Sequence, residues 1–356
     1  MSVYKDPKTG KWFCMYRIKD IRGKRKQIKK TGFKTKELAY KYECSKIVDS
    51  DLYFNKRIKV KELYKKYIEY YKDLRSPSTI RAYYYIYKNC LVTLKDKYVS
   101  DITFDDLVYF RKQLLSKGYS VDRINTIVSL IKSLLNYAIK YSYLQNNPCL
   151  LLDSLKDYSI NVSKVDFYTV EEFKQFISVI PKDNIFYVAF NVLYYTGLRC
   201  GELLSLNVSD VDLKNSVIKV NKTLVRDISG KQLVKTAKTN SSNDNVYIPN
   251  NLKKILELYL LKLNPNNPLL IYNGHRLSVK TLENYKNKYC DDSGLRRIRL
   301  HDFRHSFASL IYELSDYNFS EVAKRLRHSN VSTVMKTYIH VFPNRKNEVD
   351  NKLDLL

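Results

Sequence analysis

The segment from residue 300 to residue 338 limits the fold of this chain most, because it holds two helix patterns with a break between them. His301 and Arg304 are three residues apart in LHDFRHSFASL, so on a helix their side chains share one face. His328 and Tyr338 are ten residues apart, which on one straight helix corresponds to roughly 15 Å. Residues 329–333 are rich in Ser, Asn and Thr, which favour helix N-caps. We therefore expect a turn there and a new helix that carries Tyr338.

A turn at 329–333 would let the two ends of this segment meet. Imidazole and guanidinium groups donate hydrogen bonds to anions, and a tyrosine hydroxyl is a potential nucleophile. The hypothesis from this segment alone is that His301, Arg304, His328 and Tyr338 surround one phosphate.

The net charge of the chain indicates which kind of partner it binds. The 356 residues include 63 Lys and Arg against 36 Asp and Glu, a formal net charge of +27. Such a chain is expected to bind nucleic acid, with an acidic membrane surface as the lesser alternative. No run approaches eighteen apolar residues and the first residues lack an apolar signal segment, so neither a membrane span nor secretion is expected. Six cysteines without CxxC spacing predict reduced structural thiols in the cytoplasm.

The first fifty residues hold much of this charge, with 15 Lys and Arg against five acidic residues. Residues 2–5, 12–18 and 25–30 indicate strands separated by turns at 7–10 and 21–24. Thr35 is expected to cap the helix that follows. A small sheet with one helix and a basic face can lie in a DNA groove. The alternative is a solvated face of a structural subdomain.

Residues 51–60 indicate a linker, and the pattern beyond it is helical. Helices are predicted over 60–74, 79–94, 104–118 and 120–144, with breaks or caps at Ser76 and Thr103. They predict a compact helical domain. Arg81 and Arg123 lie near helix starts and are candidates for phosphate contacts, with a solvated surface as an equal alternative.

The rest of the chain mixes helix and strand. Residues 149–165 lack a clear period and indicate a linker, and a capped helix begins near 168–172. A long apolar helix over 184–206 is interrupted at Thr196 and Gly197. Strands are expected at 216–220, 233–235 and 246–249, and everything beyond Asn250 is expected to be helical.

Several classes are disfavoured by what the sequence lacks. There is no internal repeat of solenoid length and no GxxxxGK[ST] stretch, which disfavours a solenoid and a P-loop ATPase. There is no HExxH and no paired acidic cluster of metal-ligand type, which disfavours a two-metal nuclease.

Arg199 is the upstream candidate for anion binding. It follows the Thr-Gly break in TGLRCGELLSL, and Glu202 lies three residues on, where it can pair with Arg199 and orient it. The alternative is a surface ion pair worth about 0–1 kcal/mol. The apolar flanks favour an arginine that has an anionic partner.

These motifs together resemble the tyrosine recombinases, the integrase family of phages and integrative elements. The resemblance rests on TGLRCGE around Arg199, Lys238 in a turn before VYIP, HDFRH at 301–305, LRHS at 326–329 and KTYIH around Tyr338, whose order and spacing match over residues 168–345. It implies a multidomain, mainly α fold with small β-sheets. It also implies an arm-type DNA-binding domain of three strands and a helix at 1–52 and a helical core-binding (SAM-like) domain at 57–150. A mixed, mainly-α catalytic domain of tyrosine recombinase type follows at 165–345, and a C-terminal tail at 346–356.

The resemblance also implies how a phosphodiester is held. Arg199 and Arg304 clamp the two non-bridging oxygens, because guanidiniums donate bidentately and stay charged at any working pH. His328 donates to a phosphate oxygen, and Lys238 protonates the departing 5′ oxygen. Neither a metal nor another cofactor is expected.

Tyr338 is the implied nucleophile. Forming a phenolate at pH 7 from a group of pKa about 10 costs roughly 4 kcal/mol, which a base or a cationic field must offset. His301 is the expected acceptor of the proton. Glu202 is expected to orient Arg199, and His305 to support or pack against the site.

Three details of this sequence qualify the match. The turn offers Lys231, Lys235 and Lys238, and we choose Lys238 because its polar turn and following V-x-I-P strand fit the family context. Arg327 stands where the family usually has Gly, and Asn245 where it often has Arg.

The function implied is site-specific recombination by the integrase of a temperate phage or integrative element, through a covalent 3′-phosphotyrosine and without ATP or metal. A type IB topoisomerase-like enzyme and a catalytically inactive architectural DNA-binding protein are the alternatives. The arm-type domain disfavours the first, and the full set of key residues disfavours the second.

The resemblance implies partners as well. They are double-stranded DNA at core and arm sites and a homotetramer on that DNA, with a DNA-bending host factor and an excisionase as further candidates and no membrane. The expected place is the nucleoid in the cytoplasm of a bacterial host. The tail either docks on a neighbouring protomer or frays.

Overall fold

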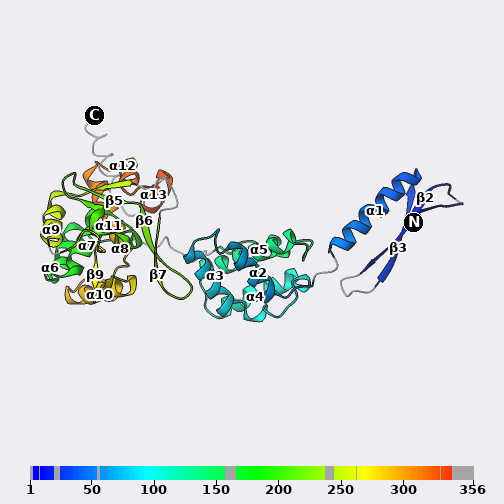
Figure 1. Ribbon diagram of the computed structural model, residues 1–356, viewed down its shortest axis with the longest axis horizontal. Coiled ribbons are helices and arrows are strands. Elements are labelled where there is room, and N and C mark those ends of the chain that lie inside the picture. The colour runs from blue at the N-terminus through cyan, green and yellow to red at the C-terminus, as the bar shows by residue number, and fades with distance from the viewer. Residues whose placement is uncertain are drawn as a thin grey trace, which may run out of the picture. The chain divides into compact units, whose positions relative to one another are not determined.

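Figure 1 shows the computed structural model of the chain, which describes residues 3–7, 9–19, 25–53, 57–156, 166–236, 244–261, 263–328 and 330–338. The chain divides into two units, Met1–Ser159 and Ile160–Leu356. The prediction of a multidomain, mainly helical protein with small sheets is confirmed. Within the described ranges, no helix is both long and apolar enough to cross a lipid bilayer.

The chain begins with an antiparallel sheet of β1 (Val3–Lys5), β2 (Trp12–Lys19) and β3 (Arg25–Phe33), in that order. Strand alternation puts Cys14 and Tyr16 on one face, where they pack with Ala39 of α1 (Lys36–Tyr53). Thr35 Oγ1 accepts a hydrogen bond from the backbone N–H of Leu38 at 3.2 Å. The predicted strands and cap are therefore confirmed, while the turn at 21–24 lies outside the described residues.

The predicted linker over 51–60 begins too early. Helix α1 continues to Tyr53, because the stretch before it contains no Gly or Pro that would end a helix.

The predicted helical domain is built from α2 (Val60–Tyr71), α3 (Pro77–Asn89), α4 (Phe104–Ser116) and α5 (Val121–Lys140), with the 3-10 turns η1 (Leu91–Thr93), η2 (Val99–Asp101) and η3 (Pro148–Leu151). Hydroxyl groups cap three of the helices. Ser76, Thr103 and Ser120 each accept a backbone N–H from three residues on, at 3.2, 3.1 and 3.3 Å. The expected helices are present, although each of the four ends two to five residues earlier than predicted. Their shared core includes Leu63, Tyr67, Phe110, Ile127 and Leu134.

The second unit begins with α6 (Val170–Ser178), α7 (Ile185–Thr196), α8 (Cys200–Ser205) and η4 (Val208–Asp210). Its strands are β4 (Val211–Asp212), β5 (Val217–Val220), β6 (Lys222–Arg226), β7 (Gln232–Thr236), β8 (Asp244–Tyr247), β9 (Ile271–Tyr272) and β10 (His275–Arg276). They pair antiparallel in the orders β4-β5-β8, β6-β7 and β10-β9. The later helices are α9 (Asn250–Leu260), α10 (Val279–Asp292), α11 (Asp302–Leu314), α12 (Phe319–Arg325) and α13 (Val331–Tyr338).

The prediction that everything beyond Asn250 is helical is wrong at the β9–β10 hairpin. Tyr272 pairs with His275, and the two residues between them have positive φ, 50° at Asn273 and 78° at Gly274. An Asn-Gly pair with both φ values positive is the turn that matches the twist of a two-residue hairpin.

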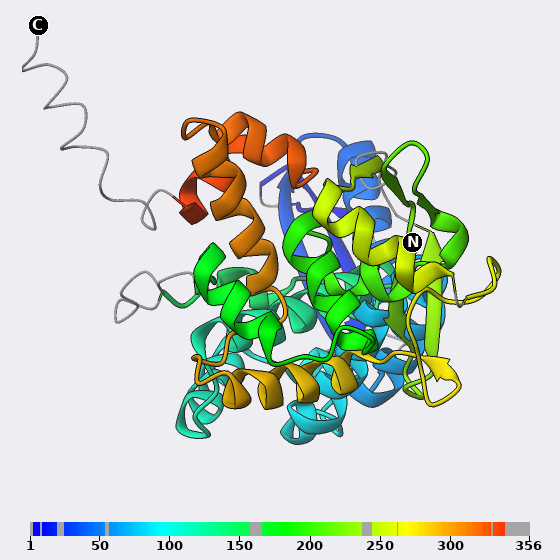
Figure 2. The same ribbon diagram turned by 90° about the vertical axis from the view of Figure 1, so that its left-hand side faces the viewer.

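Helix α7 lies at the centre of the second unit and packs against α11. Phe190 of α7 stacks on Phe303 of α11, with ring centroids 5.4 Å apart. A smaller core joins the last helices, shown in orange and red in Figure 2, and includes Phe307, Leu326 and Val334. This packing brings the end of α7, the start of α11 and the ends of α12 and α13 to one place.

Candidate active site

Arg199 lies in the break between α7 and α8. Gly197 ends α7 with φ of 62°, and a Cβ added there would lie 2.3 Å from Phe307 Cδ1, so this position requires glycine. The backbone N–H of Arg199 donates to Glu202 Oε2 and its Nη1 donates to Glu202 Oε1, both at 2.9 Å. Glu202 is buried, whereas the Arg199 side chain is 42% exposed. The expected pair is present, and it leaves the guanidinium accessible to an anion.

Arg304 lies in the first turn of α11 and is buried. Its Nη1 donates to the carbonyl of Gly197 at 2.6 Å, and its Nη2 donates to the carbonyl of Leu326. Burial, followed by repulsion from Arg199, lowers the pKa of Arg304 to about 10, so the group stays cationic at neutral pH. One guanidinium thus ties the end of α7 to the end of α12.

His301 immediately precedes α11 and is exposed. Its neighbour Asp302 is buried and accepts hydrogen bonds from the backbone N–H of Arg299 at 2.7 Å and from Arg299 Nη2 at 3.0 Å. These bonds fix the segment that enters the helix. Loss of hydration and then Arg304 lower the pKa of His301.

A Schellman motif ends α12 and fixes the backbone position of His328. The backbone N–H of His328 donates to the carbonyl of Ala323, and that of Arg327 donates to the carbonyl of Lys324, both at 2.9 Å. Arg327 therefore takes the position where such motifs favour glycine, with φ of 55°. The backbone here has the shape expected of the family's glycine, but it carries an arginine side chain. Burial, then Arg304 and Arg199, lowers the pKa of His328.

Helix α13 carries Tyr338 after the predicted break. Asn330 Oδ1 accepts the backbone N–H of Ser332 at 2.8 Å, so the expected turn and new helix are confirmed. Tyr338 is 5% exposed and packs in the small core of the last helices.

Tyr338 Oη lies 2.5 Å from His305 Nδ1. Burial raises the pKa of Tyr338, and Arg304 opposes that rise in part. Burial, with His301 as the next cause, lowers the pKa of His305 to about 4. At neutral pH the pair is therefore an uncharged phenol against an uncharged imidazole.

The contact of Tyr338 with His305 differs from the expectation for His301. The ring centroids of His301 and His305 are 4.9 Å apart, and those of His305 and Tyr338 are 5.4 Å apart, so the His305 ring contacts both of the others. His305 is four residues beyond His301, one turn further along the same helix face. The imidazole within hydrogen-bond reach of Tyr338 is consequently His305.

The structure thus brings Arg199, His301, Arg304, His328 and Tyr338 together. The pKa of His328 responds to burial and then to Arg304, Arg199 and His301, and that of Tyr338 to burial and then Arg304, as expected for groups that share one site. Lys238 lies outside the described residues, and Lys235 is exposed on β7. A phosphate at this site would meet two guanidiniums and two imidazoles next to a tyrosine hydroxyl.

Comparison with known proteins shows the family of this chain. The model of the phage integrase family matches residues 166–345, half of the chain. The chain belongs to the phage integrase family. An arm DNA-binding domain model matches residues 2–47.

Individual relatives extend the match beyond the catalytic part of this integrase-family chain. It is 36% identical over 269 residues to the ICEBs1 integrase of Bacillus subtilis (strain 168), covering 72% of each protein. Its fold is similar to the Tn1549 transposon integrase in complex with a circular intermediate DNA, with a TM-score of 0.68 and 19% identity over 83% of this chain and 99% of that one. It is also similar to a lambda integrase tetramer bound to a Holliday junction, with a TM-score of 0.57 and 16% identity over 92% and 96%.

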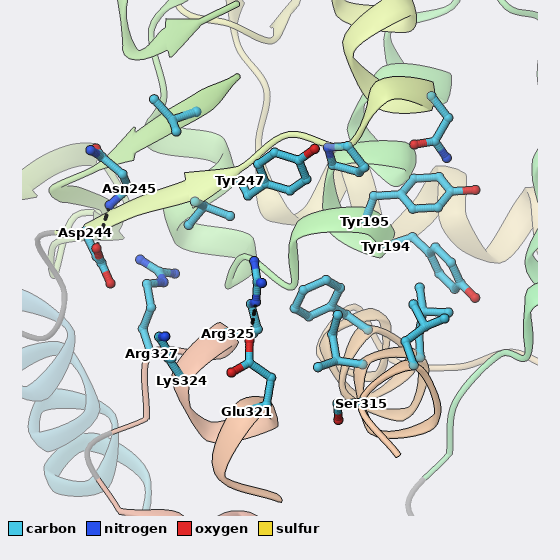
Figure 3. A pocket seen from close by; sticks show the side chains of 18 of the residues that line it. Tyr194, Tyr195, Asp244, Asn245, Tyr247, Ser315, Glu321, Lys324, Arg325 and Arg327 are labelled. Atoms are coloured by element: carbon cyan, nitrogen blue, oxygen red, sulfur yellow. Dashed lines mark hydrogen bonds and ion pairs between the residues drawn. The ribbon is translucent and has the colours of Figure 1, made fainter. Parts of the chain in front are cut away.

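Arg327 lines a cavity of about 880 Å³ in this family member. Its walls include Tyr194 and Phe307, and Figure 3 shows Arg327 at the end formed by Asp244 and Asn245 of β8. Arg327 Nη2 donates to Glu202 Oε2 at 2.5 Å, so Glu202 binds arginines from two segments.

Two features of this integrase were missed at the sequence level. The contact of His305 with Tyr338 depends on how α13 packs on α11, which no local pattern reveals. The contact of Arg327 with Glu202 joins residues 125 apart in the chain. The one available signal was the arginine in place of the family's glycine.

Proposed function

We propose that this protein is a site-specific DNA recombinase, the integrase of a mobile element, that cleaves and rejoins DNA through a 3′-phosphotyrosine. The observation that carries the proposal is the Tyr338 hydroxyl, which lies against a neutral imidazole in a cluster that also holds Arg199 and Arg304. Similarity to the ICEBs1 integrase over most of both chains supports the mobile-element role.

In the proposed reaction, Tyr338 Oη attacks the scissile phosphorus. The new O–P bond forms as the bond from phosphorus to the 5′ oxygen breaks, which leaves a 3′-phosphotyrosine and a free 5′-hydroxyl. Arg199 and Arg304 would neutralise the extra negative charge on the non-bridging oxygens, which is the largest electrostatic demand of the step. His328 and His301 would complete the donors around those oxygens.

The proton of Tyr338 would pass to His305 Nδ1. The depressed pKa of His305 keeps the imidazole neutral and able to accept at pH 7, while binding of the DNA phosphate would favour its charged form. Lys238 would return a proton to the departing 5′ oxygen, as the resemblance implies. His305 would thus take up one proton and Lys238 would release one, so the step needs no external acid or base. Religation would reverse the same steps.

The proposal needs neither ATP nor a metal ion. The phosphotyrosine keeps the energy of the broken phosphodiester, so a new 5′-hydroxyl can displace the tyrosine without further input. Arginines would supply the positive charge that a divalent ion supplies in other phosphoryl-transfer sites.

The division of labour along the chain is also proposed. Residues 1–52 would bind arm-type DNA, residues 57–150 core DNA and residues 165–345 would perform catalysis, with 346–356 as a tail. Recombination would take place in a homotetramer on two DNA duplexes, and the lambda integrase tetramer on a Holliday junction is the supporting precedent. The setting would be the nucleoid in the bacterial cytoplasm, with a DNA-bending host factor and an excisionase as candidate partners.

A DNA duplex of the element's attachment site, nicked next to the cleavage point, tests the proposal. The short fragment diffuses away after cleavage, so a covalent protein–DNA complex accumulates. The wild-type protein is expected to form this complex. Tyr338→Phe is expected to form none while it binds DNA normally. Tyr194 is a buried tyrosine of α7, and Tyr194→Phe is expected to behave as wild type. Binding without any covalent complex would instead support an architectural protein. A covalent complex without exchange between two different sites would support a topoisomerase.

A further inference from the structure

Arg327 is held in a backbone conformation that disfavours it. At φ of 55° a side chain strains the backbone, and glycine avoids that strain. Four other non-glycine residues in the described part of the second unit have positive φ, namely Ser216, Asn273, Asp316 and Tyr317, and of these Asn273 and Asp316 belong to types that tolerate this conformation. Strain of this kind persists where surrounding contacts enforce it, often at functional sites.

The side chain of Arg327 is costly as well. It is 3% exposed, and its only hydrogen bond among the described residues is from Nη2 to Glu202, while Nε and Nη1 are buried without a partner. Each unpaired buried donor has lost its hydrogen bonds to water without replacement, which destabilises the fold. Stability alone would therefore favour a glycine at this position, and the arginine calls for a reason in function.

The hydrogen bonds of Glu202 indicate that functional reason, because this carboxylate binds both Arg199 and Arg327. Its Oε1 accepts Arg199 Nη1, and its Oε2 accepts both the backbone N–H of Arg199 and Arg327 Nη2. Three bonds from two directions fix the carboxylate, and the carboxylate in turn fixes the guanidinium of Arg199. Arg304 joins the same two chain segments through the carbonyls of Gly197 and Leu326.

We propose that Arg327 is a positioning residue for strand cleavage, which clamps Glu202 so that Glu202 holds Arg199 in place for the scissile phosphate. The inference rests on the proposed recombinase function. The clamp would also couple the turn that carries His328 to the loop that carries Arg199, so that both phosphate ligands move as one body. Displacing a bound reacting group by about 1 Å costs on the order of 100-fold in rate.

Arg327→Gly is the decisive variant, because it relieves the backbone strain while it removes the clamp. We expect the covalent complex to form at least tenfold more slowly, with DNA affinity within twofold of wild type and a melting temperature that does not fall. Arg327→Lys keeps the charge but not the forked geometry, and it is expected to recover part of the rate. Two controls should retain the wild-type rate: Asp316→Gly, which places glycine at a left-handed residue of an exposed turn, and Arg325→Ala, which removes a nearby exposed arginine.

A titration of the Glu202 carboxyl by ¹³C NMR, assigned with Glu202→Gln, gives a readout that does not depend on activity. Among the described residues, the charged groups that face Glu202 are Arg199 and Arg327 by contact and Arg304 through space. Burial raises the pKa of Glu202, but Arg327 and then Arg199 outweigh that effect and hold it below the ordinary value. Loss of Arg327 should raise the pKa and move the acid limb of the cleavage–pH profile upward.

The outcomes separate the two proposals. A wild-type rate in Arg327→Gly, or a Glu202 pKa that does not move, overturns the role of Arg327 and leaves the recombinase function intact. A wild-type protein that forms no covalent complex overturns the proposed function, and the carboxyl titration then still decides whether Arg327 clamps Glu202.

Discussion

Tyr338 Oη and His305 Nδ1 lie 2.5 Å apart, and this contact joins the last described helix to α11. Both groups are uncharged at neutral pH, since burial raises the pKa of Tyr338 and lowers that of His305 to about 4. In the proposed mechanism this contact is the path of the phenolic proton, and His305 takes the role that was expected of His301.

His305→Asn tests that path. Asn Oδ1 takes the place of imidazole Nδ1 and can accept the hydrogen bond, but an amide cannot take up the proton. Because a positioned base contributes about 10²–10⁴ in rate, we expect covalent-complex formation to fall by at least 100-fold with DNA binding retained. His275→Asn, at an exposed position on β10, is the matched control. A larger loss in His301→Asn than in His305→Asn would return the base to His301.

The same histidine predicts how stability depends on pH. An unfolded histidine titrates near 6.5, whereas the pKa of folded His305 is about 4. Between these values the unfolded state binds the proton and the folded state does not, so stability falls as the pH drops from 6.5 toward 4. The full effect is roughly 3 kcal/mol at most. It is measured as the difference in unfolding free energy between wild type and His305→Asn over that pH range. A difference that stays constant would mean that His305 is not desolvated.

The ends of several helices could be predicted from the sequence alone. Ser76 and Thr103 were predictable as caps because a hydroxyl before a helix pattern acts on N–H groups three residues away. The break before α13 was predictable for the same reason, as Asn330 shows. These are local effects, and they place the elements well.

Contacts between residues far apart in the chain could not be predicted from the sequence. Whether α13 meets α11 at His301 or at His305 is decided by packing of Phe307, Leu326 and Val334, a difference of a single helical turn. Likewise, the sequence marks Arg327 as unusual but does not say which carboxylate it meets. Tertiary contacts decide both questions.

Gly197→Ala is predicted to be severely destabilising. The added Cβ would meet the Phe307 ring at 2.3 Å and would also strain a backbone with φ of 62°, so α7 and α11 must separate. We expect a loss of about 3 kcal/mol or more in urea unfolding, typical of overpacking combined with strain. Gly294→Ala is the control, because its φ of 69° is similar but nothing lies within 4 Å of the new Cβ. Equal losses in the two variants would mean that only the backbone matters at Gly197.

Lys238→Ala is predicted to slow cleavage while leaving DNA affinity nearly unchanged. An alkoxide leaving group needs a proton, and a positioned acid contributes about 10²–10⁴ in rate. A substrate with a 5′-bridging sulfur needs no acid, so it should restore cleavage by the variant. Lys235→Ala, on the exposed strand β7, serves as the control. Failure of the sulfur substrate to rescue Lys238→Ala would assign the acid to another group.

Lys29 of β3 is predicted to contact DNA phosphate in the arm-type domain. It lies opposite Met15 on the sheet face away from α1, with its Nζ 4.1 Å from the centre of the Phe13 ring. Phosphate contacts release counterions, so Lys29→Gln should reduce the slope of log affinity against log salt by about one on arm-site DNA. Lys41→Gln, which removes a lysine paired with Glu37 on α1, should leave the slope unchanged. An unchanged slope in Lys29→Gln, or an equal change in both variants, would mean that the open face of the sheet does not bind DNA.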